Sequence, residues 1–371
     1  MKVGIIGLGQ AGGRIADLLA FYNTSKEFEG FATFTIVFNT SKADLSQLTH
    51  ISDKDRHLIG ERLTKGEGVG LNAELAERIA KENERVIFQA LEEKGGMKLD
   101  AIIVIAGLGG GTGSGFLPVF LKVLKMIYHE PIYALGILPS DDEGGLMAYN
   151  TIRCLKNIYD HADSIILFDN NLWKRPELSI QESYKYMNEE LVKPILYIMN
   201  AGVVSAKRSF GTKPIDALDV INTLHGFTAL GHAEIPLPKG ISIFKKREEI
   251  DAATRCYSVV RNSTTGKLTV ECELPDVRRA LFIVTGPQKE VSAEGLDKAR
   301  AWLESVTLNA EVRGGDCLIQ GSDKITGTVA LSGMYNIPRI KPLLKKAALL
   351  IKKREEKPKA EEIFRIEEGE E

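Results

Sequence analysis

The sequence contains little cysteine, and neither sign of charge predominates in it. Lysine and arginine number 48 against 50 aspartates and glutamates, so the formal net charge of the 371 residues is -2. No basic block stands out, which argues against nucleic acid or an anionic membrane as the main partner. The cysteines lack C-x-x-C or zinc-like spacing, and scattered free thiols are typical of the reducing cytoplasm, where we expect the protein to reside. They are Cys154, Cys256, Cys272 and Cys317. The six histidines form no metal-binding motif either, so we assign no protein residues as metal ligands.

No hydrophobic stretch of the sequence is expected to span a membrane. The longest uncharged run, residues 101–121, is long enough to cross a bilayer, but six glycines in its middle indicate a loop between two elements. Met1 leads directly into Val3-Gly4-Ile5-Ile6 without the basic start or the cleavage site of a signal peptide. We therefore expect neither a leader nor direct insertion into a membrane.

What the sequence does contain is a series of short apolar stretches that alternate with helical patterns. Buried strands alternating with helices predict an α/β fold with a parallel sheet covered on both faces. A long central helix follows at residues 179–199, where Pro194 is expected to cause a kink or a shifted hydrogen-bond ladder. The strands are predicted at residues 2–7, 33–38, 101–106, 132–138 and 164–168, and the earlier helices at 14–21, 73–91 and 116–128.

After the long helix the pattern changes to one with fewer helices per strand. Strands predicted at 268–274, 280–284 and 326–332, with a helix at 292–306, suggest a second, smaller α+β domain. A basic helix at 341–356 and a disordered tail are expected to follow. Within the tail, residues 363–366 could bind a partner, although a solubilising tail is the simpler interpretation. The predicted divisions are 1–178, 179–220 for the central helix and the loop after it, 221–335, and 336–371.

The strongest chemical signal is the run Gly109-Gly110-Gly111-Thr112-Gly113-Ser114-Gly115, between a predicted strand and a predicted helix. Glycines there can take positive φ and bring backbone N–H groups close to an anion, and the helix adds its positive dipole end. Thr112 and Ser114 supply hydroxyl donors, and Pro118 is expected in the first helical turn. No lysine follows as a Walker A loop requires, so backbone dipoles and a metal ion, Mg²⁺, are expected to balance the phosphate charge.

A second glycine motif, at residues 7–12, matches the G-x-G-x-x-G of dinucleotide-binding folds. Dinucleotide binding needs an acid at the end of the second strand to hold the ribose, and the sequence has Asn39-Thr40 there. It would also leave the run at residues 109–115 without a role. Two phosphate loops facing one crevice favour a nucleoside triphosphate. A Rossmann-type NAD-binding oxidoreductase is the alternative from another class.

Together these motifs resemble the tubulin/FtsZ superfamily, whose signature GGGTG[ST]G matches residues 109–115. Residues 9–12 are similar to the first nucleotide loop of tubulin, and residues 68–74 to the third loop of FtsZ. Asn39-Thr40 is similar to the second loop of FtsZ, although Ser41 replaces its aspartate. The resemblance implies that the backbone amides of the first loop and of the run at residues 109–115 hold the phosphates of GTP with Mg²⁺.

The ribose and base contacts are also implied by the resemblance. Pro139 and Glu143 fall where the family's fifth loop contacts the ribose, and Met147 stands where FtsZ has an arginine. Asn170, Tyr184 and Asn188 are similar to the guanine site of tubulin, with Tyr184 stacked on the base. Without the family, Tyr184 would be interpreted as a core aromatic residue of a helix. The nucleotide-binding residues are thus expected to be Gly9, Gln10, Ala11, Gly12, Gly13, Arg14, Asn39, Gly70, Asn72, Gly109, Gly110, Gly111, Thr112, Gly113, Ser114, Pro139, Glu143, Asn170, Tyr184 and Asn188.

Residues 214–220 resemble the synergy loop of the family, with Pro214 where asparagine is usual. The resemblance implies that Asp216 and Asp219 are catalytic and polarise the water that attacks GTP bound to the next subunit. Hydrolysis would then require a head-to-tail filament. Composition alone favours a simpler interpretation, in which the two acids merely begin a helix and are stabilised by its dipole.

The chain combines a first loop and a base site similar to those of tubulin with the size of FtsZ. In this combination it most resembles the archaeal CetZ branch. This resemblance implies a cytoplasmic GTPase that binds GTP or GDP with Mg²⁺, polymerises with itself and controls cell shape. The closest alternatives are an FtsZ that builds the division ring and a relative that binds nucleotide without polymerising.

Overall fold

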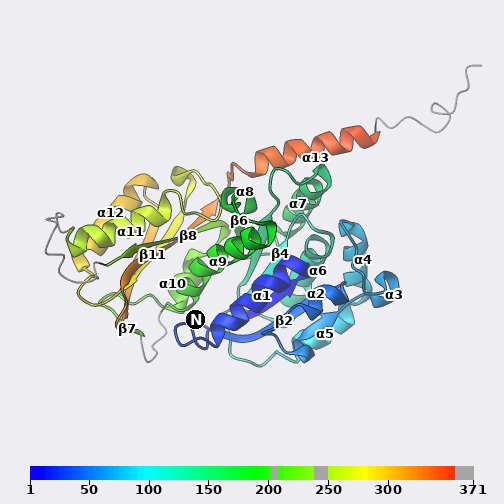
Figure 1. Ribbon diagram of the computed structural model, residues 1–371, viewed down its shortest axis with the longest axis horizontal. Helices are drawn as coiled ribbons and strands as arrows, with labels where there is room; N and C mark the ends of the chain where they lie inside the picture. Colours follow the sequence, from blue (N-terminus) through cyan, green and yellow to red (C-terminus); the bar gives the residue numbers. More distant parts are fainter. Residues whose placement is uncertain (202–207, 238–249, 356–371) are drawn as a thin grey trace, which may run out of the picture.

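One mixed sheet runs through the part of the chain that the computed structural model describes, residues 1–201, 208–237 and 250–355 (Figure 1). Its order is β3-β2-β1-β4-β5-β6-β8-β11-β9-β10-β7. The strands are β1 (Val3–Leu8), β2 (Ala32–Asn39), β3 (Arg56–Leu58), β4 (Ala101–Gly107), β5 (Ile132–Leu138), β6 (Ser164–Asp169), β7 (Arg208–Phe210), β8 (Gly226–Pro236), β9 (Arg279–Gly286), β10 (Glu311–Ile319) and β11 (Lys324–Met334).

Helices cover both faces of this sheet. Two hydrophobic clusters lie on opposite faces, one beneath α4 to α7, α11 and α12 and the other beneath α1, α2, α9 and α10. The helices are α1 (Gly9–Asn23), α2 (Lys42–Ser46), α3 (Glu61–Thr64), α4 (Ala73–Glu82), α5 (Glu84–Glu92), α6 (Gly111–Ile127), α7 (Gly145–Ile158), α8 (Asn170–Trp173), α9 (Ile180–Met199), α10 (Ala217–Thr223), α11 (Ala252–Thr264), α12 (Ala293–Val306) and α13 (Ile340–Glu355), with short 3₁₀ turns η1 (Asp53–Asp55) and η2 (Leu274–Asp276).

The strands from β3 to β6 are all parallel, as predicted. Every residue of β1, β5 and β6 is buried, which is the pattern of parallel strands with helices on both faces. The long central helix is α9, which begins with a capping box between Ser179 and Glu182 and continues through Pro194. The α/β fold with a mostly parallel sheet, a long helix and a second, smaller domain is therefore confirmed.

The second half of the sheet continues directly from the first. β8 pairs in parallel with β6 over three residue pairs, Ser164 to Ile166 with Gly226 to Thr228, whereas β11 lies antiparallel to β8 and β9. Beyond those pairs β6 and β8 separate, and Thr269 bridges them: its N–H donates to the Leu230 carbonyl (2.7 Å), and its own carbonyl accepts from the Asp169 N–H (2.7 Å).

Three predicted elements differ from the structure. The strand expected at 268–274 is wrong, because that segment forms only an isolated bridge, Leu268 with Gly231 of β8. The helix expected at 73–91 is two helices, α4 and α5, which meet at Asn83. α6 begins at Gly111 rather than 116, so Pro118 lies in its interior and not in its first turn.

Within the described residues no helix is long and apolar enough to cross a membrane. The same residues contain no cluster of three or more His, Cys, Asp or Glu side chains arranged to hold a metal ion. The tail peptide at residues 363–366 lies outside the described residues. The predicted domain divisions stay a prediction.

Candidate functional site

A cleft of about 510 Å³ opens at the carboxyl ends of β1, β2, β4, β5 and β6. This edge is where open parallel sheets bind their ligands. Most residues predicted to contact the nucleotide line it: Gln10, Ala11, Arg14, Asn39, Gly70, Gly109, Gly110, Gly111, Thr112, Gly113, Pro139, Glu143, Asn170, Tyr184 and Asn188. The remaining ones, Gly9, Gly12, Gly13, Asn72 and Ser114, are not in its wall.

The glycines of the first motif bring helix α1 close to the sheet. Gly9 has a φ of +69° at the point where β1 ends and α1 begins, so the chain turns into the helix without a loop. A Cβ on Gly12 would lie 2.1 Å from the Ile105 carbonyl oxygen, and one on Gly13 would contact Val37. Gly9, Gly12 and Gly13 therefore support the cleft from behind, while Gln10, Ala11 and Arg14 line it.

The second glycine run has a different conformation from the predicted one. Gly110 is the N-cap of α6 and residues 111–115 are helical, and none of the glycines from 109 to 115 has a positive φ. They are required by close packing instead: a Cβ would lie 2.4 Å from the Gly70 oxygen at Gly111, 2.7 Å from the Gly107 oxygen at Gly113, and 2.3 Å from the Ala73 oxygen at Gly115. The Ser114 hydroxyl donates to the Gly110 carbonyl and is buried, so it is not the donor to the cleft that we expected.

Two helix N-termini consequently meet at the floor of the cleft. Neither α1 nor α6 has a side-chain cap, and so the N–H groups of their first turns keep no side-chain partner there. Such N-termini attract anions through these donors and through the helix dipole. Thr112 stands beside them, with its Oγ1 2.8 Å from the Thr40 Oγ1.

The second loop contributes a carboxylate that our sequence analysis missed. Asp44 lines the cleft, where its oxygens accept hydrogen bonds from Gln10 Nε2 (2.7 Å) and Asn39 Nδ2 (3.3 Å). The signal was present, because Ser41 and Asp44 have the spacing of a helix start and Ser41 Oγ accepts the Asp44 N–H (3.2 Å). FtsZ has an aspartate at the position of Ser41. In this chain the first turn of α2 places the carboxylate of Asp44 near that position.

The third loop also differs in detail from the prediction. Gly70 lines the cleft together with Glu67, which we had not assigned. Asn72 instead caps α4 by accepting the Leu75 N–H at its Oδ1 (2.9 Å). The third loop therefore adds a second unassigned carboxylate to the cleft.

The other end of the cleft is formed by the β5–α7 loop, the start of α8 and helix α9. The Glu143 carboxylate accepts the Ser140 N–H (2.6 Å), and Met147 packs against Gly109. Tyr184 is 43% exposed on α9, so it is not the core aromatic residue that its spacing alone suggested. Burial, followed by the charge of Glu143, raises the pKa of Tyr184 above its usual value. Asn170 and Asn188 complete this wall.

Asp216 and Asp219 do not line the cleft. Asp216 is the N-cap of α10 and accepts the Asp219 N–H (2.9 Å), while Asp219 accepts the Asp216 N–H (3.1 Å). Asp219 also lies 3.5 Å from Arg313 Nε. The pair follows the carboxyl end of α9, whereas Tyr184 is near its amino end, about 22 Å away along the helix. The two acids do begin a helix, and their catalytic role stays a prediction.

Comparisons with known proteins agree over the length of the chain. Residues 2–175 match the GTPase domain of the tubulin/FtsZ family, and residues 177–349 match the C-terminal domain of tubulin-like CetZ proteins. CetZ1 of Haloferax volcanii is 36% identical over 92% of this chain and 91% of its own.

Solved structures show the same relationship. The GDP-bound monomer of CetZ1 from Haloferax volcanii superposes with a TM-score of 0.83, covering 95% of this chain and all of its own at 36% identity. The GTPγS-bound protofilament of CetZ2 from the same organism gives 0.84 at 31% identity, covering 96% of this chain and all of its own. The two glycine-rich helix starts, the cleft between them and these matches agree: the chain belongs to the tubulin/FtsZ family, as one of its CetZ proteins.

Proposed function

We propose that the chain binds GTP and GDP in this cleft and hydrolyses GTP within head-to-tail filaments of its own copies, as part of a cytoplasmic cytoskeleton that controls cell shape. The observation that carries the proposal is the meeting of two uncapped helix N-termini, α1 and α6, at the floor of one cleft. Membership of the tubulin/FtsZ family argues against the alternative hypothesis of an NAD-binding oxidoreductase. The CetZ2 relative was solved as a GTPγS-bound protofilament, which supports self-assembly.

The charges in the cleft favour a divalent cation beside the phosphates. Arg14 shares the lining of the cleft with three carboxylates, those of Asp44, Glu67 and Glu143, so the side chains that line it cannot neutralise a triphosphate. Carboxylate and hydroxyl oxygens, together with phosphate oxygens and water, are the ligands that Mg²⁺ prefers. Asp44, Glu67 and Thr112 would hold the ion, which would screen the phosphate charge. The backbone N–H groups of α1 and α6 would orient the phosphates.

The opposite wall of the cleft suits a guanine base. The half-exposed ring of Tyr184 offers a stacking surface, and the amides of Asn170 and Asn188 offer both donors and acceptors to the base edge. Pro139 lines the cleft beside Gly109, and Glu143 is close enough to Tyr184 to raise its pKa, so we assign these two residues to the ribose. The cleft thus offers separate regions for the phosphates, the ribose and the base of a guanine nucleotide.

Hydrolysis requires a group that orients water, and we assign this role to Asp216 and Asp219 of the adjoining subunit. Their capping box holds both carboxylates in one arrangement, and the side chain of Asp216 is exposed. Replacing both by asparagine keeps the helix cap and removes the charge. We expect the double variant to bind GTP as the wild type does and to lose turnover by about 100-fold or more. Asp251→Asn, at the N-cap of α11, is the matched control and should keep the wild-type rate.

A mixing experiment tests whether the site is shared between chains. The double variant Asn170→Ala, Asn188→Ala should lose GTP binding but keep both acids. The double variant Asp216→Asn, Asp219→Asn should keep GTP binding but lack the acids. Phosphate release that reappears when the two inactive proteins are mixed supports a composite site. A double aspartate variant that hydrolyses GTP at the wild-type rate refutes the catalytic assignment. Failure of the wild type to pellet with GTP at any salt or crowding condition refutes the filament.

A further inference from the structure

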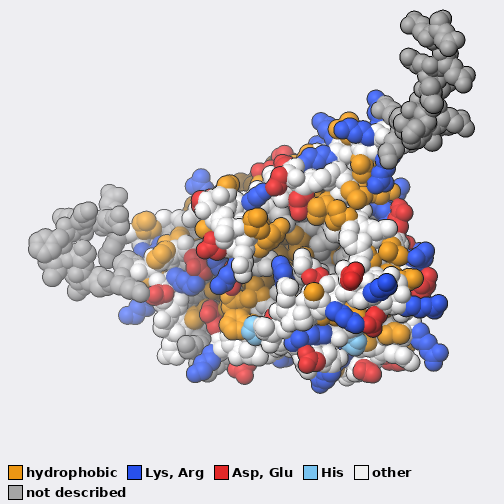
Figure 2. Space-filling model, turned by 45° about the vertical axis from the view of Figure 1, so that its right-hand side comes forward, with side chains coloured by type: hydrophobic (Ala, Val, Ile, Leu, Met, Phe, Trp, Pro, Cys, Tyr) orange, Lys and Arg blue, Asp and Glu red, His pale blue; other side chains and the backbone are white. Residues whose placement is uncertain are grey.

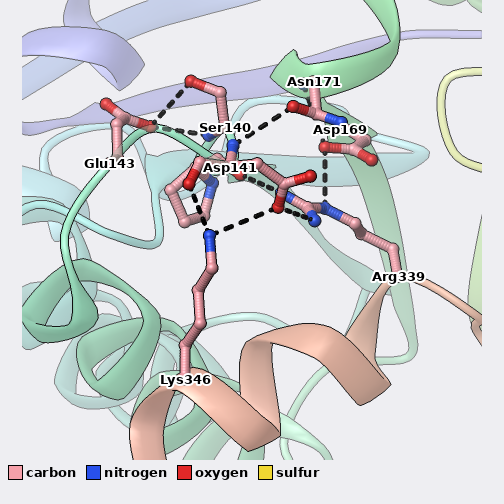
Figure 3. A network of polar contacts seen from close by, with 8 residues as sticks. Ser140, Asp141, Glu143, Asp169, Asn171, Arg339 and Lys346 are labelled. Atoms are coloured by element: carbon pink, nitrogen blue, oxygen red, sulfur yellow. Dashed lines mark hydrogen bonds and ion pairs between the residues drawn. The ribbon is translucent and has the colours of Figure 1, made fainter. Parts of the chain in front are cut away.

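The C-terminal segment contacts the segments that form the cleft wall through Arg339, which precedes α13. Its side chain is only 7% exposed, and its guanidinium lies between two segments of the chain (Figure 3). Nε donates to Asp169 Oδ1 (3.1 Å), Nη1 to the Asp141 carboxylate (2.5 Å) and Nη2 to the Pro139 carbonyl (2.8 Å). A planar guanidinium with three directed hydrogen bonds fixes its partners in a way that the single ammonium of lysine cannot.

Both segments held by Arg339 supply the wall assigned to ribose and base. The β5–α7 loop carries Pro139 and Glu143 into the cleft, and Asn170 directly follows Asp169. The Asp141 N–H also donates to Asn171 Oδ1 (3.1 Å), so the two segments contact each other (Figure 3). Arg339 itself does not line the cleft. Its place is that of a positioning residue, which acts through the loops that it joins.

Helix α13 adds a second attachment to the same loop. Lys346 Nζ donates to the Asp141 carbonyl (2.5 Å) and lies 3.4 Å from the Asp141 carboxylate. The helix packs on α7 through Leu343 and Ala347, which are buried, and Figure 1 shows it extending across the nucleotide-binding domain from the end of β11. Its outer face, with Lys341 and Lys345, is exposed, and Figure 2 shows basic side chains gathered there. The seating of α13 therefore sets the position of the β5–α7 loop.

The charges make this arrangement sensitive to the loss of Arg339. Burial raises the pKa of Asp169 to about 6 even though Arg339 opposes the shift, and the side chain is only 3% exposed. The hydrogen bond from Arg339 lowers the pKa of Asp141. Without the guanidinium, the ionised Asp169 would be an uncompensated buried charge, which is strongly unfavourable. Its carboxylate would then have to take up a proton, or the segment that carries it would have to move. Movement of the segment would carry Asn170, the next residue, with it, and protonation would weaken the hydrogen bond that Asp169 accepts from the Asn171 N–H.

We propose that Arg339 and Lys346 position the wall of the cleft assigned to ribose and base. The affinity of the protein for guanine nucleotides and its selectivity for the base would then depend on the position of α13. The inference rests on the proposed GTP-binding function. It makes α13 a route by which anything that displaces the C-terminal segment changes nucleotide binding.

The test uses the full chain and the variants Arg339→Lys and Lys346→Ala, with Lys345→Ala as the control on the exposed face of α13. Titration with a fluorescent GDP derivative gives the affinity, competition by GTP and by ATP gives the selectivity, and melting of the nucleotide-free protein gives the stability. For Arg339→Lys we expect affinity to fall about tenfold, as for the loss of one good hydrogen bond, and the preference for GTP over ATP to fall with it. For Lys346→Ala we expect a loss of about threefold. Lys345→Ala should match the wild type.

The outcomes separate positioning from simple destabilisation. If Arg339→Lys lowers the melting temperature and weakens GTP and ATP equally, the residue is only structural and the proposal fails. It also fails if both variants bind with wild-type affinity and selectivity. Should Arg339→Lys not fold, Lys346→Ala, which changes a partly exposed side chain, decides alone. A wild type that binds neither GTP nor GDP refutes the proposed function instead.

Discussion

Gly115→Ala tests whether the signature glycines exist for packing. The residue lies in the first turns of α6 and does not line the cleft, and a Cβ there would meet the Ala73 carbonyl oxygen at 2.3 Å and the Ala76 Cβ at 2.6 Å. Alanine is the better helix former by about 1 kcal/mol, which would stabilise α6. Overpacking costs about 1–3 kcal/mol, and the upper value applies here because backbone atoms of α4 must move. The net expectation is a loss of about 2 kcal/mol of unfolding free energy.

Equilibrium urea unfolding of the nucleotide-free protein, followed by circular dichroism, measures this loss. Gly144→Ala is the control, since it replaces the N-cap of α7, where no atom lies within 4 Å of the added Cβ. The control should stay within about 1 kcal/mol of the wild type. Displacement of α4 should also weaken GDP binding, because the loop before α4 carries Gly70 in the cleft wall. A Gly115→Ala protein as stable as the wild type, with unchanged GDP affinity, would show that helix propensity prevails and that α4 moves freely.

Three further predictions concern stability and reactivity. Tyr133→Phe should stabilise the protein by about 1 kcal/mol in thermal unfolding, because the Tyr133 hydroxyl is buried without a hydrogen-bond partner; a loss of stability would reveal a partner. Burial alone would raise the pKa of Asp17, but the N–H groups of Thr49, His50 and Ile51 lower it overall, so its stabilisation is present above pH 3.8 and fades below it. Asp17→Asn should therefore cost about 2 kcal/mol at pH 7, and less as the pH falls below 3.8; a cost that stays constant in acid contradicts this account. Burial raises the pKa of Cys154 to about 12, so this thiol should react with a disulfide reagent at pH 8 only after urea is added; rapid labelling of Cys154 in the native state would be the opposite result.

Much of the fold could be predicted because its parallel strands are continuous apolar runs. β1, β4, β5 and β6 were each expected within a residue or two of their ends. β8 was missed, since its sequence places Gly231 and His232 among apolar residues, and their environment is set by β11 and the Thr328 hydroxyl rather than by local pattern. The false strand at 268–274 has the right alternation, but the backbone hydrogen bonds that join it to strands are made by Thr269, with Leu230 within β8 and with Asp169 at the end of β6.

The site was predictable where the residues form a contiguous motif and not where distant segments meet. The glycine run was found, but its helical conformation was not predicted. The reason for glycine in a helix here is that a Cβ would meet the carbonyl oxygens of Gly70 and Ala73, and their positions are known only from the fold. Arg339 is far in sequence from Asp141 and Asp169, with nothing local to indicate that they meet. Its role became visible only with the fold.

The short joint between β6 and β8 has a mechanical consequence for a filament subunit. Apart from the two edge strands, every other neighbouring pair in the sheet shares at least six residue pairs, whereas this one shares three. A lengthwise load, applied through contacts at opposite ends of the subunit, would strain this ladder first, while α9 runs beside it and contacts both halves. Few strand-to-strand hydrogen bonds therefore oppose a rotation of the two halves about α9, and we expect this joint to be the most compliant part of the sheet interior.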